Sequence, residues 1–168
     1  IEVAISDYSG QFTMGVPDVG FEREVPPECP PHRVRLTKPY YLGTFEVTQA
    51  QYERVMGQNP SWHTTSTGLK DVPEQDTGNL PVEQVSWEEA TEFCRRLTQL
   101  HGERAMNLVY RLPTEAEWEY VCRAGRSDPY PWAPDADPRT GENAGNLEKK
   151  SLDICAVGSY LPNAFGVH

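Results

Sequence analysis

Several signatures of common catalytic and binding sites are missing from the sequence. Its four cysteines form no C-x-x-C pair, which argues against a structural zinc site. It has no glycine-rich phosphate-binding loop and no G-x-S-x-G motif around a nucleophilic serine. No apolar run is long enough to cross a bilayer, so the sequence predicts no membrane span. These absences point away from nucleotide-binding loops, serine hydrolases with that motif and transmembrane helices.

Basic residues are scarce relative to acidic ones. The chain has 15 Lys and Arg against 25 Asp and Glu, a net charge of −10. A surface of that sign repels phosphate backbones, so the sequence predicts no nucleic-acid partner. With 38% hydrophobic and 24% charged residues, the 168-residue chain has the composition and length of one globular domain with a real core.

Turn-forming residues, by contrast, are plentiful, with 13 Gly and 15 Pro. Residues 16–32 are dense in Pro and charged residues, and residues 126–153 are dense in Pro, Gly, Asp and Asn. Both segments are predicted to be irregular loops. A loop as long as the second one usually has a function or holds an ion.

Short alternating stretches predict strands at three places. Residues 10–15 end in a glycine turn, residues 32–47 contain two short strands with a break near Pro39, and residues 154–160 form a last short strand.

Three segments share the capping box that starts a helix. A Ser or Thr oxygen accepts from the amide three residues later, and the Glu or Gln at that position reaches back to the cap amide. Each segment also ends near a glycine, which favours a left-handed stop. The segments are 48–57, 86–102 and 114–125, with the pairs Thr48 and Gln51, Ser86 and Glu89, and Thr114 and Glu117, and the stops Gly57, Gly102 and Gly125.

The four tryptophans are predicted to be large apolar anchors. Helical phase places Trp87 and Trp118 in the core. Trp62 and Trp132 lie in loops, where core packing under the loop and the lining of a peptide-binding groove are both open interpretations. The longest helix should bury one apolar stripe, made of Trp87, Ala90, Phe93, Cys94, Leu97 and Leu100.

Acidic side chains crowd into the stretch RLPTEAEWEYVCR, residues 111–123. Glu115 and Glu117 fall in the first helical turn, where negative charge suits the helix dipole. Glu119 is spaced to pair with Arg123 at i, i+4. Because each charge has a structural use, the pattern favours helix anchoring over a catalytic carboxylate pair.

Cysteines and histidines are scattered along the chain. Four cysteines can pair in three ways, so reduced thiols and disulfides both remain open. The histidines come from different predicted elements, which favours surface or loop positions over a metal-binding triad. The residues are Cys29, Cys94, Cys122 and Cys155, and His32, His63 and His101.

A series of motifs, taken in order, resembles the formylglycine-generating enzyme family, also called sulfatase-modifying factors. The resemblance runs from about Gln11 to the end. It implies an irregular, loop-rich α+β fold of the C-type-lectin-like kind, with three short helices and short antiparallel strands in a single domain over residues 1–168. The motifs are FTMG, PPHRVRL, YLGTFEVTQAQYERVM, LPVEQVSWEEATEFCRRL, YRLPTEAEWEYVCRAG, YPWAP, NAGNL and VGSYLPNAFG.

The resemblance also implies an activity. Catalytic members are oxidoreductases that convert a sulfatase cysteine to formylglycine with oxygen and a copper ion, which a late pair of cysteines holds. That pair has no counterpart here, so we expect a C-terminally incomplete domain, no catalytic residue in these 168 residues, and copper only in complete relatives. Cys94 and Cys122 match positions that form disulfides with later cysteines in some members.

Other members of the family suggest alternatives. Some are non-haem-iron enzymes that join sulfur to a histidine betaine, and some are non-catalytic modules that bind ligands. The expected partner is therefore a sulfatase or another protein or peptide.

Calcium is the metal that the resemblance places within the chain. Relatives bind it through an asparagine and the following carbonyl, which correspond to Asn146 and Leu147 of NAGNL, and Asp153 is a further predicted ligand. Oxygen ligands of these kinds suit a hard cation. The alternative is that Asn143 and Asn146 only shape turns.

Overall fold

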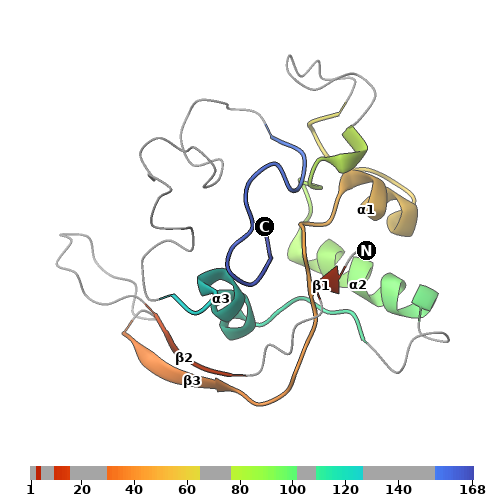
Figure 1. The fold of residues 1–168 in the computed structure, drawn as a ribbon. Coiled ribbons are helices and arrows are strands. Elements are labelled where there is room, and N and C mark those ends of the chain that lie inside the picture. Colours follow the sequence, from red (N-terminus) through yellow and green to blue (C-terminus); the bar gives the residue numbers. More distant parts are fainter. Residues whose placement is uncertain (1–2, 5–9, 16–29, 65–76, 102–108, 127–153) are drawn as a thin grey trace.

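The computed structural model describes residues 3–4, 10–15, 30–64, 77–101, 109–126 and 154–168. In these ranges the fold is α+β, with short helices and short antiparallel strands joined by irregular segments, as predicted (Figure 1). The elements are β1 (Val3–Ala4), β2 (Gly10–Met14), β3 (His32–Leu36), β4 (Leu42–Gly43), α1 (Gln49–Met56), η2 (Thr77–Asn79), α2 (Trp87–His101) and α3 (Glu115–Arg123).

The strands form two antiparallel pairs. β2 pairs with β3, with Phe12 opposite Val34, and β1 pairs with β4. Exposure alternates along β2, so Phe12 and Met14 turn toward the interior while the residues between them face solvent. The predicted strand at 10–15 and the two strands within 32–47, separated around Pro39, are confirmed. β1 was not predicted.

The predicted strand over residues 154–160 is wrong. These residues form turns, and Gly158 has a positive φ of 75° that interrupts an extended run. The segment instead connects distant elements. Val157 N donates to Asn79 O of η2 at 3.0 Å, and Asn163 Nδ2 donates to Val121 O of α3 at 2.8 Å. In Figure 1 this C-terminal segment lies between α3 and the α1–α2 pair.

The helices begin where the capping boxes predict. In α1 and α3 both reciprocal bonds of the box are present, and in α2 Ser86 N donates to Glu89 Oε2 at 2.8 Å. α1 ends at Gly57, in the left-handed region with φ 82°. α3 ends near Gly125 as predicted, with Gly125 in the left-handed region at φ 81°, but the cap residue itself is Ala124, which is also left-handed with φ 48°. The stop predicted for α2 at Gly102 lies outside the described residues.

The core between α1 and α2 is small and aromatic. Tyr52 and Phe93 stack with ring centroids 5.4 Å apart, and Leu97 completes the buried cluster. On the other side, α3 lies over the β2–β3 pair (Figure 1). There the ring centroids of Phe12 and Tyr120 are 5.3 Å apart.

The end of β2 is tied to α3 through a charged pair. Gly15 N donates to Glu119 Oε1 at 2.8 Å, and Arg123 Nη2 donates to Gly15 O at 2.8 Å. Glu119 and Arg123 also form the predicted ion pair, at 2.7 Å. None of the helices that the structure describes is long and apolar enough for a bilayer.

Candidate functional site

A polar network supports the short loop that follows α1. We call residues 58–64 the Trp62 loop. Gln49 in the first turn of α1 is 1% exposed, and its Oε1 accepts from Asn59 Nδ2 while its Nε2 donates to His63 O, both at 2.9 Å. The loop is therefore bonded at both ends to one buried side chain.

The segment before α2 holds the same loop from a second direction. His63 N donates to Glu83 Oε1 at 2.8 Å, and Glu83 N donates to Ser61 Oγ at 3.2 Å. Ser61 N in turn donates to Asn59 Oδ1 at 3.1 Å. With bonds from α1 and from the segment before α2, the backbone of the loop has little freedom to rearrange.

Glu83 is kept ionised by its hydrogen bonds. Burial opposes ionisation, but donors from the backbone and ring of His63 and from the Trp62 amide outweigh it and hold the pKa of Glu83 below its usual value. His63 Nδ1 lies 3.3 Å from Glu83 Oε1. Because a carboxylate only accepts, Nδ1 is the donor, and in the neutral ring Nε2 is left as an acceptor.

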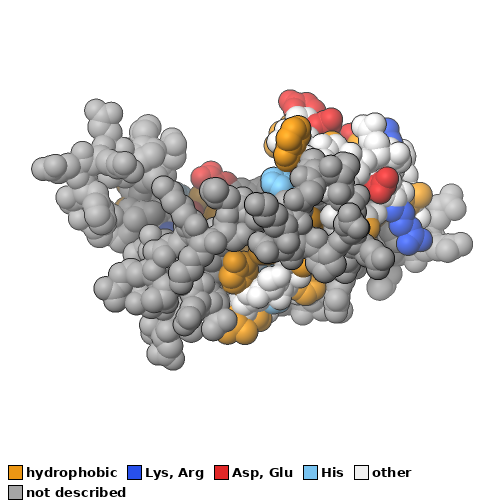
Figure 2. All heavy atoms as spheres, turned by 90° about the horizontal axis from the view of Figure 1, so that it is seen from above, with side chains coloured by type: hydrophobic (Ala, Val, Ile, Leu, Met, Phe, Trp, Pro, Cys, Tyr) orange, Lys and Arg blue, Asp and Glu red, His pale blue; other side chains and the backbone are white. Residues whose placement is uncertain are grey.

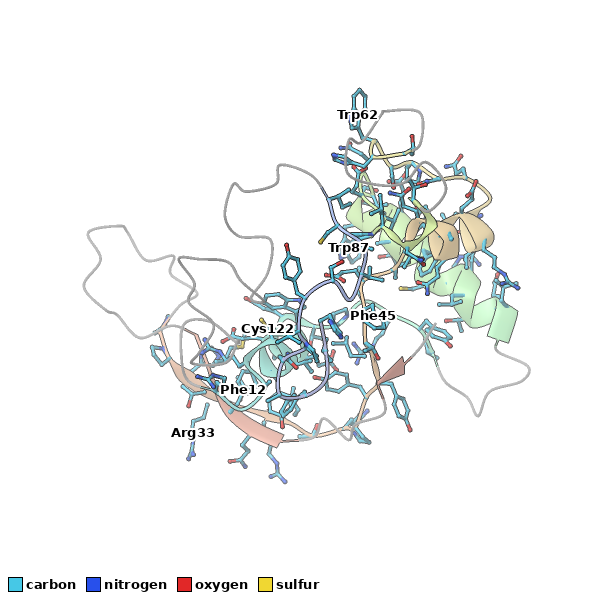
Figure 3. The ribbon with its side chains drawn as sticks, turned by 45° about the horizontal axis from the view of Figure 1, so that its top comes forward. Phe12, Arg33, Phe45, Trp62, Trp87 and Cys122 are labelled. Atoms are coloured by element: carbon cyan, nitrogen blue, oxygen red, sulfur yellow. The ribbon has the colours of Figure 1, made fainter. Side chains whose placement is uncertain are left out.

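Trp62 projects away from this network. Its residue is 68% exposed, and Figure 3 shows the side chain pointing out from the ribbon. Of the two interpretations that the sequence left open for Trp62, packing beneath the loop is therefore wrong. Trp132 lies outside the described residues. On the face seen in Figure 2, hydrophobic and acidic side chains of the described residues lie together at the upper edge.

Two tryptophans that helical phase placed in the core are exposed. Trp87 is 69% exposed at the start of α2, and Trp118 is 57% exposed on α3. The stripe predicted on α2 is buried only at its middle, where Phe93 and Leu97 are 5% and 4% exposed. Leu100, at the end of that stripe, is also exposed. On both α2 and α3, the apolar face is therefore buried over only part of the helix.

The acidic stretch at the start of α3 has the structural role that the sequence predicts. Arg111 Nη2 and Nη1 donate to the two carboxylate oxygens of Glu117, each at 2.6 Å, and Tyr40 Oη donates to Glu117 O at 2.8 Å. The bonds from Arg111, together with those from Thr114, lower the pKa of Glu117 to about 2 against the opposing effect of burial. This carboxylate is committed to the ion pair and the cap, which leaves it unsuited to proton transfer near neutral pH.

The cysteines in the described part of the chain are unpaired, and two of them are hard to ionise. Cys94, Cys122 and Cys155 are free thiols there, and Cys29 lies outside it. Burial raises the pKa of Cys94 and of Cys122, which disfavours the thiolate that binds metals and reacts.

Metal ligands do not gather within the described ranges. No group of three or more His, Cys, Asp and Glu side chains there is arranged to hold a metal ion. His32 lies at the start of β3 and His63 in the Trp62 loop, and nothing is described of the His101 side chain. The predicted calcium ligands Asn146, Leu147 and Asp153 all lie outside the described residues.

Sequence reasoning missed the network beneath the Trp62 loop. Gln49 and Glu83 lie within two of the family motifs and Asn59 in none, but no motif indicated that these three side chains serve one loop. The only local signal was the Asn-Pro-Ser turn that follows the glycine at the end of α1.

Short capped helices, small antiparallel sheets and hydrogen-bonded irregular segments define the class of fold. Within that class, the profile described as the sulfatase-modifying factor enzyme 1-like domain matches residues 3–168. The chain therefore belongs to this family, which agrees with the resemblance seen in its motifs.

Individual proteins extend the comparison. The formylglycine-generating enzyme of Bos taurus is 23% identical over 212 residues, which cover 95% of this chain and 53% of that enzyme. The structure of PvdO from Pseudomonas aeruginosa is 29% identical, with a TM-score of 0.69 over 95% of this chain and 63% of that one. Treponema denticola variable protein 1 has the same fold, at 24% identity and a TM-score of 0.72, covering 95% and 66%. The chain thus spans about half the length of the bovine relative.

Proposed function

We propose that this chain forms the scaffold part of a domain that oxidises a sulfatase cysteine to formylglycine. The observation that carries the proposal is an alignment that covers 95% of the chain, at 23% identity, with an enzyme named for that reaction. In this proposal, capped helices and hydrogen-bonded loops stabilise the fold. The three described cysteines serve as packing groups and do not bind a redox metal. Copper, where catalytic relatives bind it, supplies the oxygen chemistry, and no described residue of this chain is assigned to hold it.

The test is conversion of a sulfatase cysteine by the whole protein that contains this chain. The protein is co-expressed with a sulfatase, and the target peptide is examined by mass spectrometry for the aldehyde, with capture by a hydrazide as confirmation. Conversion above that of cells without the protein supports the proposal, and no conversion beside an active bovine enzyme refutes it. Cys94→Ser and Cys122→Ser should keep most of the conversion, since burial raises the pKa of both thiols and disfavours the reactive thiolate.

One observation favours a second function, that of a protein-binding module on the same scaffold. Trp62 is 68% exposed on a loop that two separate segments hold in place. A rigid exposed indole offers contact area at a low entropic cost, as in many recognition surfaces.

Calcium binding by Asn146, Leu147 and Asp153 remains a proposal that rests on the oxygen ligands these residues offer. We expect calcium to raise the melting temperature of the chain, and Asp153→Asn to weaken that effect. A melting temperature that calcium does not change would contradict it.

A further inference from the structure

The paired strands β2 and β3 have two different faces. Phe12 and Val34 are opposite each other in the register and share the face toward α3, where the Phe12 ring contacts Tyr120. Because side chains alternate along a strand, the residues before and after them point to the other face. Figure 3 shows the Arg33 side chain projecting from the ribbon, away from α3.

Four exposed side chains make up this second face, which we call the ribbon face. The register places Thr13 opposite Arg33 and Gln11 opposite Arg35, so the four lie together on one side of the strand pair. The ribbon face is hydrophilic and carries two positive charges. Neither strand contains an acidic residue that could offset them.

The two arginines of the ribbon face lack the ion pairs that other arginines of the chain form. Among the described residues, no ion pair involves Arg33 or Arg35. Elsewhere the carboxylates of Glu92, Glu117 and Glu119 each pair with an arginine. Two guanidinium groups on the same side of a strand repel each other. An anionic partner removes this repulsion and accepts charge-assisted hydrogen bonds from both groups.

We propose that the ribbon face docks an extended acidic segment of a partner protein, with carboxylates at alternate positions. A strand rises by about 3.4 Å per residue, so alternate residues on one face are about 7 Å apart. Carboxylates at alternate positions of an extended segment have the same spacing as Arg33 and Arg35. Each carboxylate pairs with one guanidinium in the bidentate geometry that arginine favours, and Gln11 and Thr13 offer further hydrogen bonds. The docking is separate from both candidate functions and depends on neither.

Charge favours a short acidic segment over larger anions. DNA or an anionic bilayer extends well beyond the ribbon face and meets the field of the whole chain, whose net charge of −10 repels it. Attraction to an anionic bilayer also usually requires about four or more basic residues. A short segment meets mainly the local charges, because charges at physiological salt are screened over about 8 Å.

Binding is measured by fluorescence anisotropy with the whole protein that contains this chain. One labelled peptide has two glutamates at positions i and i+2. A second peptide of identical composition has them at i and i+3, on opposite sides of an extended chain. We expect the first peptide to bind about threefold more tightly, the contribution of one exposed ion pair.

Substitutions at the ribbon face are compared with one elsewhere. Arg33→Glu should weaken binding of the first peptide about tenfold, because it removes an ion pair and adds repulsion. Arg54→Glu is the matched control, since Arg54 is exposed on α1, has no ion pair within the described residues and changes the net charge equally. It should leave binding within about twofold. The double variant Arg33→Glu/Arg35→Glu should bind a peptide with lysines at i and i+2 more tightly than wild type does.

Several outcomes would overturn the proposal. Equal affinity for the two glutamate peptides refutes the match in spacing, and equal weakening by Arg33→Glu and Arg54→Glu leaves only general attraction between charges. Tighter binding of duplex DNA or of phosphatidylserine vesicles than of the first peptide refutes the acidic segment as the occupant. Circular dichroism shows whether each variant is folded. In the NMR spectrum of the wild type, the side-chain N–H signals of Arg33 and Arg35, identified by their loss in Arg33→Lys and Arg35→Lys, should shift when the first peptide is added. Signals that do not move refute direct contact even if a glutamate variant is unfolded.

Discussion

The ion pair between Arg111 and Glu117 allows a quantitative test of how α3 is held. The pKa of Glu117 falls from 4.5 to about 2, mainly through its hydrogen bonds with Arg111, and the residue is 9% exposed. A shift of that size corresponds to at most about 3.4 kcal/mol of stability at neutral pH. The Arg111 side chain is 51% exposed, so solvent screens the pair, and we expect about 1.5–2.5 kcal/mol.

The substitution Glu117→Gln removes the charge and leaves the helix cap. A glutamine can reach back to the Thr114 amide, as Gln51 does at the start of α1. Urea denaturation at neutral pH should therefore show a free energy of unfolding lower by about 1.5–2.5 kcal/mol. Glu89→Gln in α2 is the matched control, because Glu89 caps its helix through Ser86 and has no ion pair in the described structure. Its substitution should cost less.

The pH dependence gives the sign of the effect. The folded pKa of Glu117 is lower than its unfolded value of 4.5, so the stabilisation is complete well above 4.5 and is lost as the pH falls toward about 2. At about pH 3 the difference between wild type and Glu117→Gln should be half or less of its value at neutral pH. A difference that stays constant with pH, or a Glu89→Gln variant that is equally destabilised, would refute the reasoning.

Three further predictions concern the turns and the thiols. Gly57→Ala should lower the free energy of unfolding by about 1 kcal/mol, because φ is 82° and alanine is strained in this left-handed conformation. The added Cβ would meet no atom within 4 Å, so no clash adds to this effect, and an unchanged urea midpoint would contradict the prediction. Asn163→Ala should lower the free energy of unfolding by about 2–3 kcal/mol and speed hydrogen exchange at the Val167 amide. The Asn163 side chain accepts from the amides of Phe165 and Val167 and donates to the Val121 carbonyl of α3. Asn163→Asp should lower the free energy of unfolding by less. Hydrogen exchange at the Val167 amide that equals wild type in both variants would refute this role of Asn163. Cys94 and Cys122 should alkylate more slowly than an exposed thiol at about pH 8, because burial raises the pKa of each, and mass spectrometry showing equal rates would contradict that burial.

Helix starts were predictable because a capping box is made within four consecutive residues. Thr48 with Gln51 and Thr114 with Glu117 form both bonds of the box in the folded chain. The pairing of Glu119 with Arg123 was predictable for the same reason, since one helical turn brings the two side chains together. What the spacing did not indicate is that both side chains also bind the backbone of Gly15, far away in the sequence.

Burial was predicted less well, and the tryptophans show why. Helical phase states which side chains share a face, but not which part of that face another element covers. α2 buries Phe93 and Leu97 where α1 crosses it, while Trp87 lies beyond that contact. α3 ends in two consecutive left-handed residues, Ala124 with φ 48° and the predicted Gly125 with φ 81°, and the sequence indicated only the glycine.

By itself, the sequence determined the places where helices begin, the short strands within residues 10–15 and 32–47, the excess of negative charge and the membership of the family. Each of these depends on neighbouring residues, on total composition or on the order of motifs. The tertiary structure alone decided that Gln49, Asn59, His63 and Glu83 meet beneath one loop and that Trp62 points outward from it. Such contacts join residues from separate segments, so they form only when packing brings those segments together and buried polar groups must find partners.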